Sequence, residues 1–338
     1  MTTRVRLLIL TVVVLLTVGG TVGYLWKQHR DDEEAKKHVA PITEISMQAL
    51  EKAPRIVFRN MNPATSYGAV GAVAVADPAG PRAILKTQCD RVYATAQRLL
   101  CLSSDRGLTT TYDAEVLDIH GLSSQLQLPL AGIPSRARLS RDGAMVATTS
   151  FAQGDSYAAT SFSTRTVITQ IKGTNYGSLE DFRLIHQGNV ITPVDRNYWG
   201  VTFASDNKTF YVTAEWAQHT WLARGDLATR TITTLHEDAE CPSLSPDGKH
   251  IVFKQRGDLP TGKWRLVSYD IASAKVTPLA ETHSVDDQVE WLDNNTVIYG
   301  LSRTGAGAAV SDVWQVPANG TGEPKVLIPQ AFSPAVVR

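Results

Sequence analysis

The chain has 338 residues, of which 33 are Lys or Arg and 33 are Asp or Glu, so its formal net charge at pH 7 is zero. This balance, together with the lack of a basic stripe interleaved with aromatic residues, excludes nucleic acid as a partner held by a basic surface. The hydrophobic fraction of 43% and the charged fraction of 20% are those of a folded globular protein and exclude a largely disordered chain.

The first predicted element is a membrane-spanning helix. Residues 7–25 are almost wholly apolar, with Arg4 and Arg6 before them and Lys27 directly after Trp26. A stretch of about 19 such residues is long enough to cross a bilayer as a helix. We therefore assign residues 1–26 to a transmembrane signal-anchor helix in the cell membrane.

Two alternatives bear on this helix. The small residues Val18, Gly19 and Gly20 are compatible with a cleaved signal peptide. We favour the retained anchor, because the apolar run continues beyond them and ends in Tyr24 and Trp26, as an interfacial belt would. Basic residues are more numerous after the helix than before it, which would leave the C-terminal side in the cytoplasm, but large domains translocate largely regardless of flanking charge. We expect the following domain on the extracytoplasmic side.

Residues 27–54 are predicted to form a juxtamembrane linker. A charge run at 31–37 is typical of a solvated spacer. Residues 42–50 can form a short helix after it.

From residue 55 to residue 338 one short sequence motif recurs with variations. Its clearest copies are the segments 137–143 and 242–248, each followed by a β-branched or aromatic strand. An apolar strand, a turn rich in Asp, Asn and Gly, and a second strand are the signature of a hairpin. Hairpins that recur at the length of one blade predict a β-propeller. We interpret the acidic residues of the turns as structural, because such side chains accept hydrogen bonds from their own turn; they are Asp142, Asp206, Asp247 and Asp293.

The two ends of this domain complement each other. Residues 56–60, 68–76 and 82–86 resemble the second to fourth strands of a blade that lacks its first strand. Residues 333–337 resemble a first strand without a blade. Pairing them closes the ring and removes both free edges. The prediction is an all-β, six-bladed propeller with four strands per blade. Its innermost strands are expected at 333–337, 91–95, 137–140, 200–204, 242–245 and 288–292.

Several segments of this domain resemble the sequences of a known family. The segment 241–253 is similar to the repeat of TolB-type β-propellers. The segments 285–293 and 312–317 resemble membrane-anchored, TolB-like translocation proteins of high-GC Gram-positive bacteria. The resemblance covers the chain from about residue 56 to its end, and it implies a role in envelope-associated transport or integrity. The chain departs from TolB by its N-terminal helix and by lacking room for a separate N-terminal α/β domain.

The residues just before each inner strand are the candidate binding site. In a propeller these segments reach the central channel, so their polar side chains are expected to converge on one mouth of it, and a concavity with convergent polar groups is the default binding-site hypothesis. The alternative is that they pair with one another and seal the channel. The candidates are Arg91, Arg136, Arg138, Asp195, Arg196, Asn197, Glu240, Asp286, Asp287 and Gln288.

The three cysteines leave two states open. Cys89 and Cys101 lie near one hairpin and can form a disulfide outside the cytoplasm, or remain as partly buried thiols. Cys241 has no partner in either case.

No catalytic motif is visible in the sequence. It has no Gly-x-Ser-x-Gly elbow and no His-Glu-x-x-His pair, and its histidines are scattered singly, without metal-ligand spacing. We therefore expect a non-enzymatic module that binds a protein or peptide partner in the cell envelope and needs neither cofactor nor metal. The alternative is a lyase or hydrolase acting on a cell-wall or carbohydrate substrate through Arg136, Arg138, Asp286 and Asp287.

Overall fold

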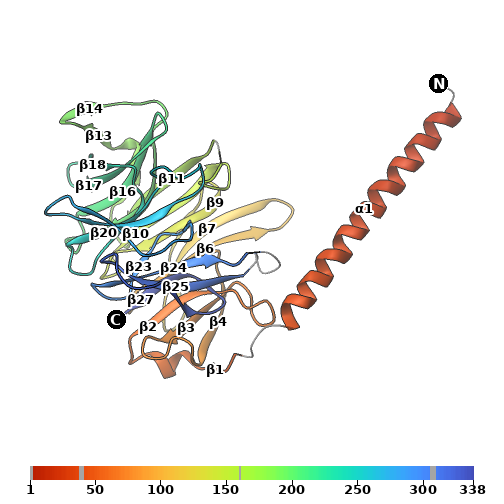
Figure 1. Cartoon of the computed structure of the whole chain (residues 1–338), viewed down its shortest axis with the longest axis horizontal. Coiled ribbons are helices and arrows are strands. Elements are labelled where there is room, and N and C mark those ends of the chain that lie inside the picture. The colour runs from red at the N-terminus through yellow and green to blue at the C-terminus, as the bar shows by residue number, and fades with distance from the viewer. Residues whose placement is uncertain (1–2, 38–41, 160, 305–309) are drawn as a thin grey trace.

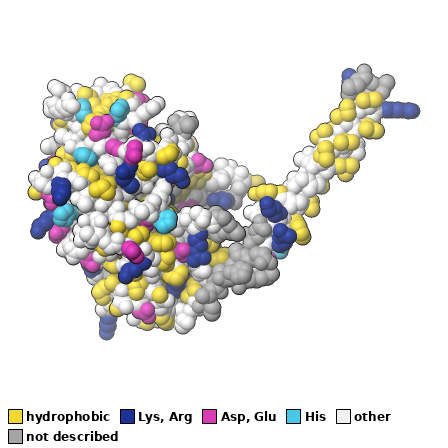
Figure 2. Space-filling view, in the orientation of Figure 1, with side chains coloured by type: hydrophobic (Ala, Val, Ile, Leu, Met, Phe, Trp, Pro, Cys, Tyr) yellow, Lys and Arg dark blue, Asp and Glu magenta, His cyan; other side chains and the backbone are white. Residues whose placement is uncertain are grey.

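The structure is a computed structural model that describes residues 3–37, 42–159, 161–304 and 310–338. A single long helix, α1 (Thr3–Lys37), stands apart from a domain made almost entirely of strands (Figure 1). The helix therefore runs through the expected charged spacer as well as the apolar segment. Hydrophobic side chains cover much of its surface, whereas charged side chains of both signs are scattered over the visible face of the strand domain (Figure 2).

The described strands form six sheets, which confirms the predicted six-bladed propeller. We number the blades in chain order, so blade 1 is the sheet that contains β2. Blades 2, 3, 5 and 6 each have four antiparallel strands in sequence order. Blade 2 has β5 (Arg91–Ala94), β6 (Arg98–Arg106), β7 (Thr110–Asp118) and β8 (Ser124–Pro129). Blade 3 has β9 (Ile133–Leu139), β10 (Met145–Gln153), β11 (Ser163–Gln170) and β12 (Asn175–Ser178).

The last two blades follow the same plan. Blade 5 has β19 (Glu240–Leu244), β20 (His250–Gln255), β21 (Arg265–Asp270) and β22 (Val276–Pro278). Blade 6 has β23 (Glu290–Trp291), β24 (Thr296–Ser302), β25 (Ser311–Pro317) and β26 (Lys325–Ile328). The first strand of each blade is innermost, at the positions that the repeats predict.

Blade 1 is completed by the C-terminus, as predicted. Strand β27 (Ala331–Val337) pairs antiparallel with β2 (Arg55–Asn60), with Ile56 opposite Val336 and Val57 opposite Ala335. Strands β3 (Ala69–Ala74) and β4 (Arg82–Gln88) follow outward. On the outer edge, β1 (Glu44–Ile45) pairs parallel with β4, and the 3-10 helix η1 (Met47–Leu50) buries Leu50 in the core. The segment 44–50 therefore packs on blade 1, and its helical part is one short turn.

Blade 4 has two strands beyond the predicted four. Its sheet runs β15 (Asn197–Phe203), β16 (Thr209–Trp216), β17 (His219–Asp226) and β18 (Thr231–Glu237), and then continues with β13 (Arg183–His186) and β14 (Asn189–Ile191). The added hairpin comes from the connection after blade 3, where the 3-10 helix η2 (Leu179–Asp181) also lies, and β13 joins β18 in parallel.

The turn residues behave as the repeat predicts. The Oγ atoms of Ser140 and Ser245 donate to Asp142 and Asp247 at 2.6 Å, and the following Gly143 has a φ of 73°, a conformation that suits glycine. Hydrophobic clusters fill the contacts between neighbouring blades. Blades 3 and 4, for example, share a cluster that contains Met145 and Phe210. Burial of large apolar side chains between sheets therefore holds the ring together.

Candidate binding site in the propeller channel

The structure gathers four cationic and four anionic side chains around the channel. Most of them lie in or just before the inner strands, which is why residues far apart in the sequence meet there. They are Arg91, Arg136, Arg138 and Lys254, with Glu240, Asp286, Asp287 and Glu290. Six of the eight are among the predicted site residues; Lys254 and Glu290 are not.

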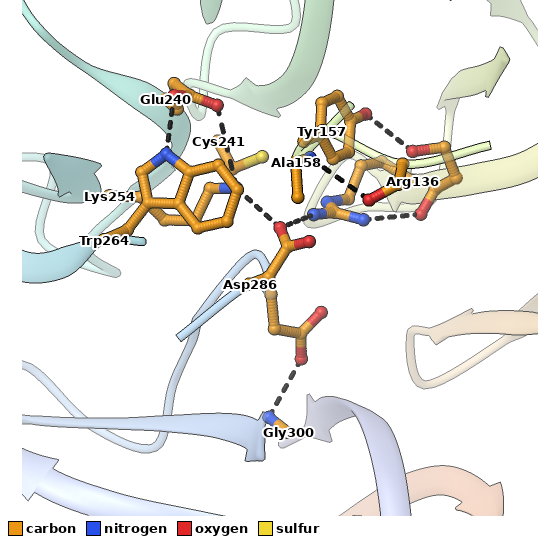
Figure 3. A network of polar contacts seen from close by, with 12 residues as sticks. Arg136, Tyr157, Ala158, Glu240, Cys241, Lys254, Trp264, Asp286 and Gly300 are labelled. Carbon is orange, nitrogen blue, oxygen red and sulfur yellow. Dashed lines mark hydrogen bonds and ion pairs between the residues drawn. The ribbon is translucent and has the colours of Figure 1, made fainter. Parts of the chain in front are cut away.

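Asp286 joins three blades at the channel end where the inner strands begin (Figure 3). Its Oδ1 lies 2.7 Å from Nζ of Lys254 and 3.3 Å from Nη2 of Arg136. Burial alone would raise the pKa of Asp286, but the Lys254 ammonium and the Arg136 guanidinium lower it to about 2. Asp286 is therefore a carboxylate at neutral pH, and 40% of its side chain remains exposed.

Lys254 is the cation that sequence reasoning missed. It lies in the second strand of blade 5, its side chain is fully buried, and its Nζ is 3.7 Å from Oε2 of Glu240. The ammonium lies 4.0 Å from the ring centroid of Trp264 and 4.9 Å from that of Tyr157 (Figure 3). Burial would lower its pKa, yet Asp286 and Glu240 raise it, so this lysine stays charged. Its position directly after the apolar run 251–253 is the one signal in the sequence that could have found it.

A second pair links blade 2 to the connection before blade 6. Nη1 of Arg91 lies 3.1 Å from Oδ1 of Asp287, and its guanidinium stacks 4.5 Å from the ring centroid of Phe332. The other oxygen of Asp287 accepts a 2.9 Å hydrogen bond from the backbone N–H of Gly300. A Cβ at Gly300 would lie 2.3 Å from the Phe332 ring, so only glycine allows the closing strand to pack here.

Further along the channel, side chains cross it and close it. Arg138 pairs with Glu290, and its Nη2 donates to the carbonyl of Val289 at 3.2 Å. The amide of Gln288 donates to the carbonyls of Val201 and Pro242 at 3.0 and 2.8 Å, which belong to blades 4 and 5. The channel is therefore not an open pore along its length.

Three predicted site residues do not join this cluster. Asp195 is exposed and accepts from the N–H of Ala217, and Arg196 donates to the carbonyls of Glu180 and Pro193. Asn197 is buried between blades 3 and 4, where its Oδ1 accepts from Thr164. The expectation that they converge on the mouth was wrong for these residues, because the connection into blade 4 carries the added hairpin and its side chains bond to nearby loops.

An opening lies at the opposite end of the channel, where the inner strands finish. A cavity of about 320 Å³ is lined there by the ends of the inner strands and the turns after them, with Arg138 and Glu290 among the residues it reaches. Its rim includes Ala96, Arg141 and Ser205, none of which the sequence singled out. By contrast, a cavity of only about 20 Å³ remains between Arg91 and Arg136. The predicted mouth is filled and the other end is open.

A disulfide lies beside the channel entrance. Cys89, just before β5, is bonded to Cys101 in β6, with their Cα atoms 5.3 Å apart. Of the two states that the sequence left open, the structure has the oxidised one. Cys241 is free and buried.

Comparison with known proteins identifies the fold. No protein-family model matches the chain, and no characterised protein matches it in sequence. Among solved structures, TolB from Acinetobacter baumannii matches with a TM-score of 0.57 at 15% identity, over 84% of this chain and 67% of its own. The chain has the TolB propeller fold. A putative TolB from Agrobacterium tumefaciens matches with a TM-score of 0.50 at 13% identity, over 83% of this chain and 90% of its own. A puromycin-hydrolysing peptidase of Mycobacterium tuberculosis matches with a TM-score of 0.47 at 12% identity, over 82% of this chain and 43% of its own.

One helix among the described residues is long and apolar enough to cross a membrane. It covers Thr3–Arg30 and has no buried part within the structure. A membrane anchor and a signal sequence both meet this description. The TolB-like propeller therefore follows an N-terminal segment of one of these two kinds.

Proposed function

We propose that this protein is a non-enzymatic binding module, held at the outer face of the cell membrane by its N-terminal helix, whose channel receives a segment of a protein or peptide of the cell envelope. The single observation that carries the proposal is the cavity of about 320 Å³ at the end of the channel. Its volume is within the usual range for binding pockets. The resemblance to TolB-like translocation proteins supports an envelope-associated role.

The lining of the cavity suits a peptide segment. Residues of all six inner strands, β5, β9, β15, β19, β23 and β27, line it, as do Arg141 and Arg338 at its rim. The Arg138–Glu290 pair lies at its inner end, and Tyr93 donates to Glu290 at 3.2 Å. A segment that enters would meet polar backbone groups and fixed side chains of both signs, which favour recognition without a covalent step.

The charged cluster at the other end has a different role in this proposal. Its acidic groups are already held by cations: Asp286 by Lys254 and Arg136, and Asp287 by Arg91. Since the pKa of Asp286 is about 2, this carboxyl would be a poor general acid near neutral pH. We therefore prefer recognition to lyase or hydrolase chemistry at these residues and assign them the role of shaping and closing the channel.

The location outside the cytoplasm rests on two features. The Thr3–Arg30 helix fits a membrane anchor, and the Cys89–Cys101 disulfide is the form expected in an oxidising compartment. Mass spectrometry of the mature protein from fractionated cells tests both, because it reads the N-terminus and the disulfide together. A protein that begins after residue 20 would contradict the membrane anchor, and one in which Cys89 and Cys101 are free thiols would contradict the location outside the cytoplasm.

Site-specific photo-crosslinking tests the binding site. Ser205 is exposed at the cavity rim, so a photoreactive amino acid at this position in the full-length membrane protein should cross-link to a protein partner. Ala96→Trp, also at the rim, should reduce the cross-link at least about tenfold, which corresponds to about 1.4 kcal/mol of binding free energy. Ala272→Trp, exposed in the turn after β21 and outside the cavity, is the matched control and should leave the yield unchanged. Equal yields from Ala96→Trp and Ala272→Trp would refute the site.

A further inference from the structure

The small cavity inside the channel is a second candidate site, independent of the proposed function. We call it the throat cavity. It has a volume of about 20 Å³ and shares Tyr93 and Arg138 with the open cavity. Its other lining residues come from earlier in the inner strands or just before them, and include Arg91, Arg136 and Ser333. It lies between the filled and the open ends of the channel.

The throat cavity is lined by three arginines, each of which already pairs with one carboxylate. Three guanidinium groups and one carboxylate, that of Asp287, line it. The side chains of Arg136, Arg138 and Asp287 are only 5%, 7% and 3% exposed. Burial and repulsion from the neighbouring charge of Arg136 lower the pKa of Arg91, whereas Asp287 and Asp286 raise it. A negative charge between Arg91 and Arg136 would offset this repulsion.

Two of the arginines that line the cavity carry hydrogen-bond donors that have no acceptor. Within the described residues, the Nε–H groups of Arg136 and Arg138 are buried and have no partner. Their other nitrogens are used, since Arg136 bonds to Ser135 and Asp286, and Arg138 bonds to Glu290 and Val289. A buried donor without an acceptor destabilises the folded protein, so native structures usually satisfy it.

We propose that the throat cavity binds one chloride-sized monovalent anion. Its volume corresponds to a single water-sized occupant, which is too small for phosphate or for a carboxylate with its carbon chain. The two unsatisfied groups are both donors, and a halide accepts from both without bringing a hydrogen of its own. The anion would bridge Arg136 and Arg138, which are neighbours on the channel side of β9, and would separate the two ends of the channel.

Anomalous scattering locates such an ion directly. Crystals of the protein grown in sodium bromide should show an anomalous peak in the throat cavity at hydrogen-bond distance from an arginine nitrogen. A throat that contains only a water molecule, with no anomalous peak, would overturn the proposal.

Thermal unfolding measures the same binding in solution. We expect the melting temperature of the wild-type protein to rise in sodium chloride relative to sodium gluconate at equal ionic strength. The rise should be roughly 2–4 °C for each tenfold increase in chloride above its dissociation constant. Arg136→Lys keeps the charge but removes the Nε–H donor. It should therefore abolish the rise in melting temperature that is specific to chloride. Arg183→Lys, exposed on the outer hairpin of blade 4, should keep it. Equal melting temperatures of the wild type in the two salts would refute the site.

Discussion

At the end of the channel where the inner strands begin, Asp286 meets Lys254 and Arg136, and Arg91 meets Asp287. At the end where the same strands finish, a cavity of about 320 Å³ stays open. The two ends differ in the kind of segment that connects to each inner strand. Long connections bring charged side chains inward at the first end, whereas tight Asp-Gly turns keep their side chains bonded to their own backbone at the other. A repeated module can therefore build two chemically different mouths from one set of strands.

The largest loss of stability is expected from removing most of β27, the strand that contributes residues to both ends of the channel. Deleting residues 333–338 takes away Ser333 from the throat and Val336 and Arg338 from the open cavity, and it leaves β2 without its partner. Loss of the buried Ala335, Val336 and Val337 side chains costs about 5 kcal/mol, comparable with the whole stability of many domains. We expect aggregated or unfolded protein by size-exclusion chromatography and circular dichroism. A truncated monomer with unchanged melting would contradict this closure.

A smaller loss of stability is expected from a substitution at the filled end, and almost none from one at the open end. Lys254→Met leaves Glu240 without its cation and Asp286 with one cation fewer, and breaking a buried ion pair in this way should lower the free energy of unfolding by about 3–5 kcal/mol. Arg141→Met, at the exposed rim of the open end, should change it by no more than about 0.5 kcal/mol. Urea unfolding of both variants measures the difference. Equal losses would mean that the filled end does not depend on its buried charges.

The smallest expected effect is a pH dependence of the stability that arises from Asp286 at the filled end. The pKa of Asp286 falls from 3.8 to about 2 on folding, so between these values the unfolded chain binds more protons than the folded one. The stabilisation from this carboxylate is thus complete above about pH 3.8 and is lost as the pH falls to about 2. Asp286→Asn should flatten the decline of melting temperature over this window, whereas Glu323→Gln, on an exposed loop, should not. A decline in Asp286→Asn as steep as in the wild type would exclude this origin.

The sequence predicted the parts of the molecule that repeat. The turns after 140 and 245, and the unpaired strands at the two ends of the domain, were enough for the blade number and the closure. It did not predict β13 and β14, because that hairpin occurs once and pairs with β18 in parallel.

The site was predicted less completely, for physical reasons. Spacing from the inner strands located Arg136 and Asp286, but their partner Lys254 lies in a second strand, and Tyr157 lies in a loop that only tertiary packing brings to the channel. The open cavity had no sequence signal, since residues from all six inner strands and from the turns after them, such as Ala96, form its wall. The position of a charged residue relative to an inner strand predicts whether its side chain reaches the channel. The volume of a cavity depends instead on how all six blades pack around the axis.

The position of Phe332 has a consequence for biosynthesis. This residue lies in the last strand of the chain, against Gly300 and beneath Arg91, so the entrance to the channel acquires its final shape only when the C-terminus arrives. A nascent chain emerging from the ribosome or the translocon would therefore carry five blades and part of a sixth with no competent channel.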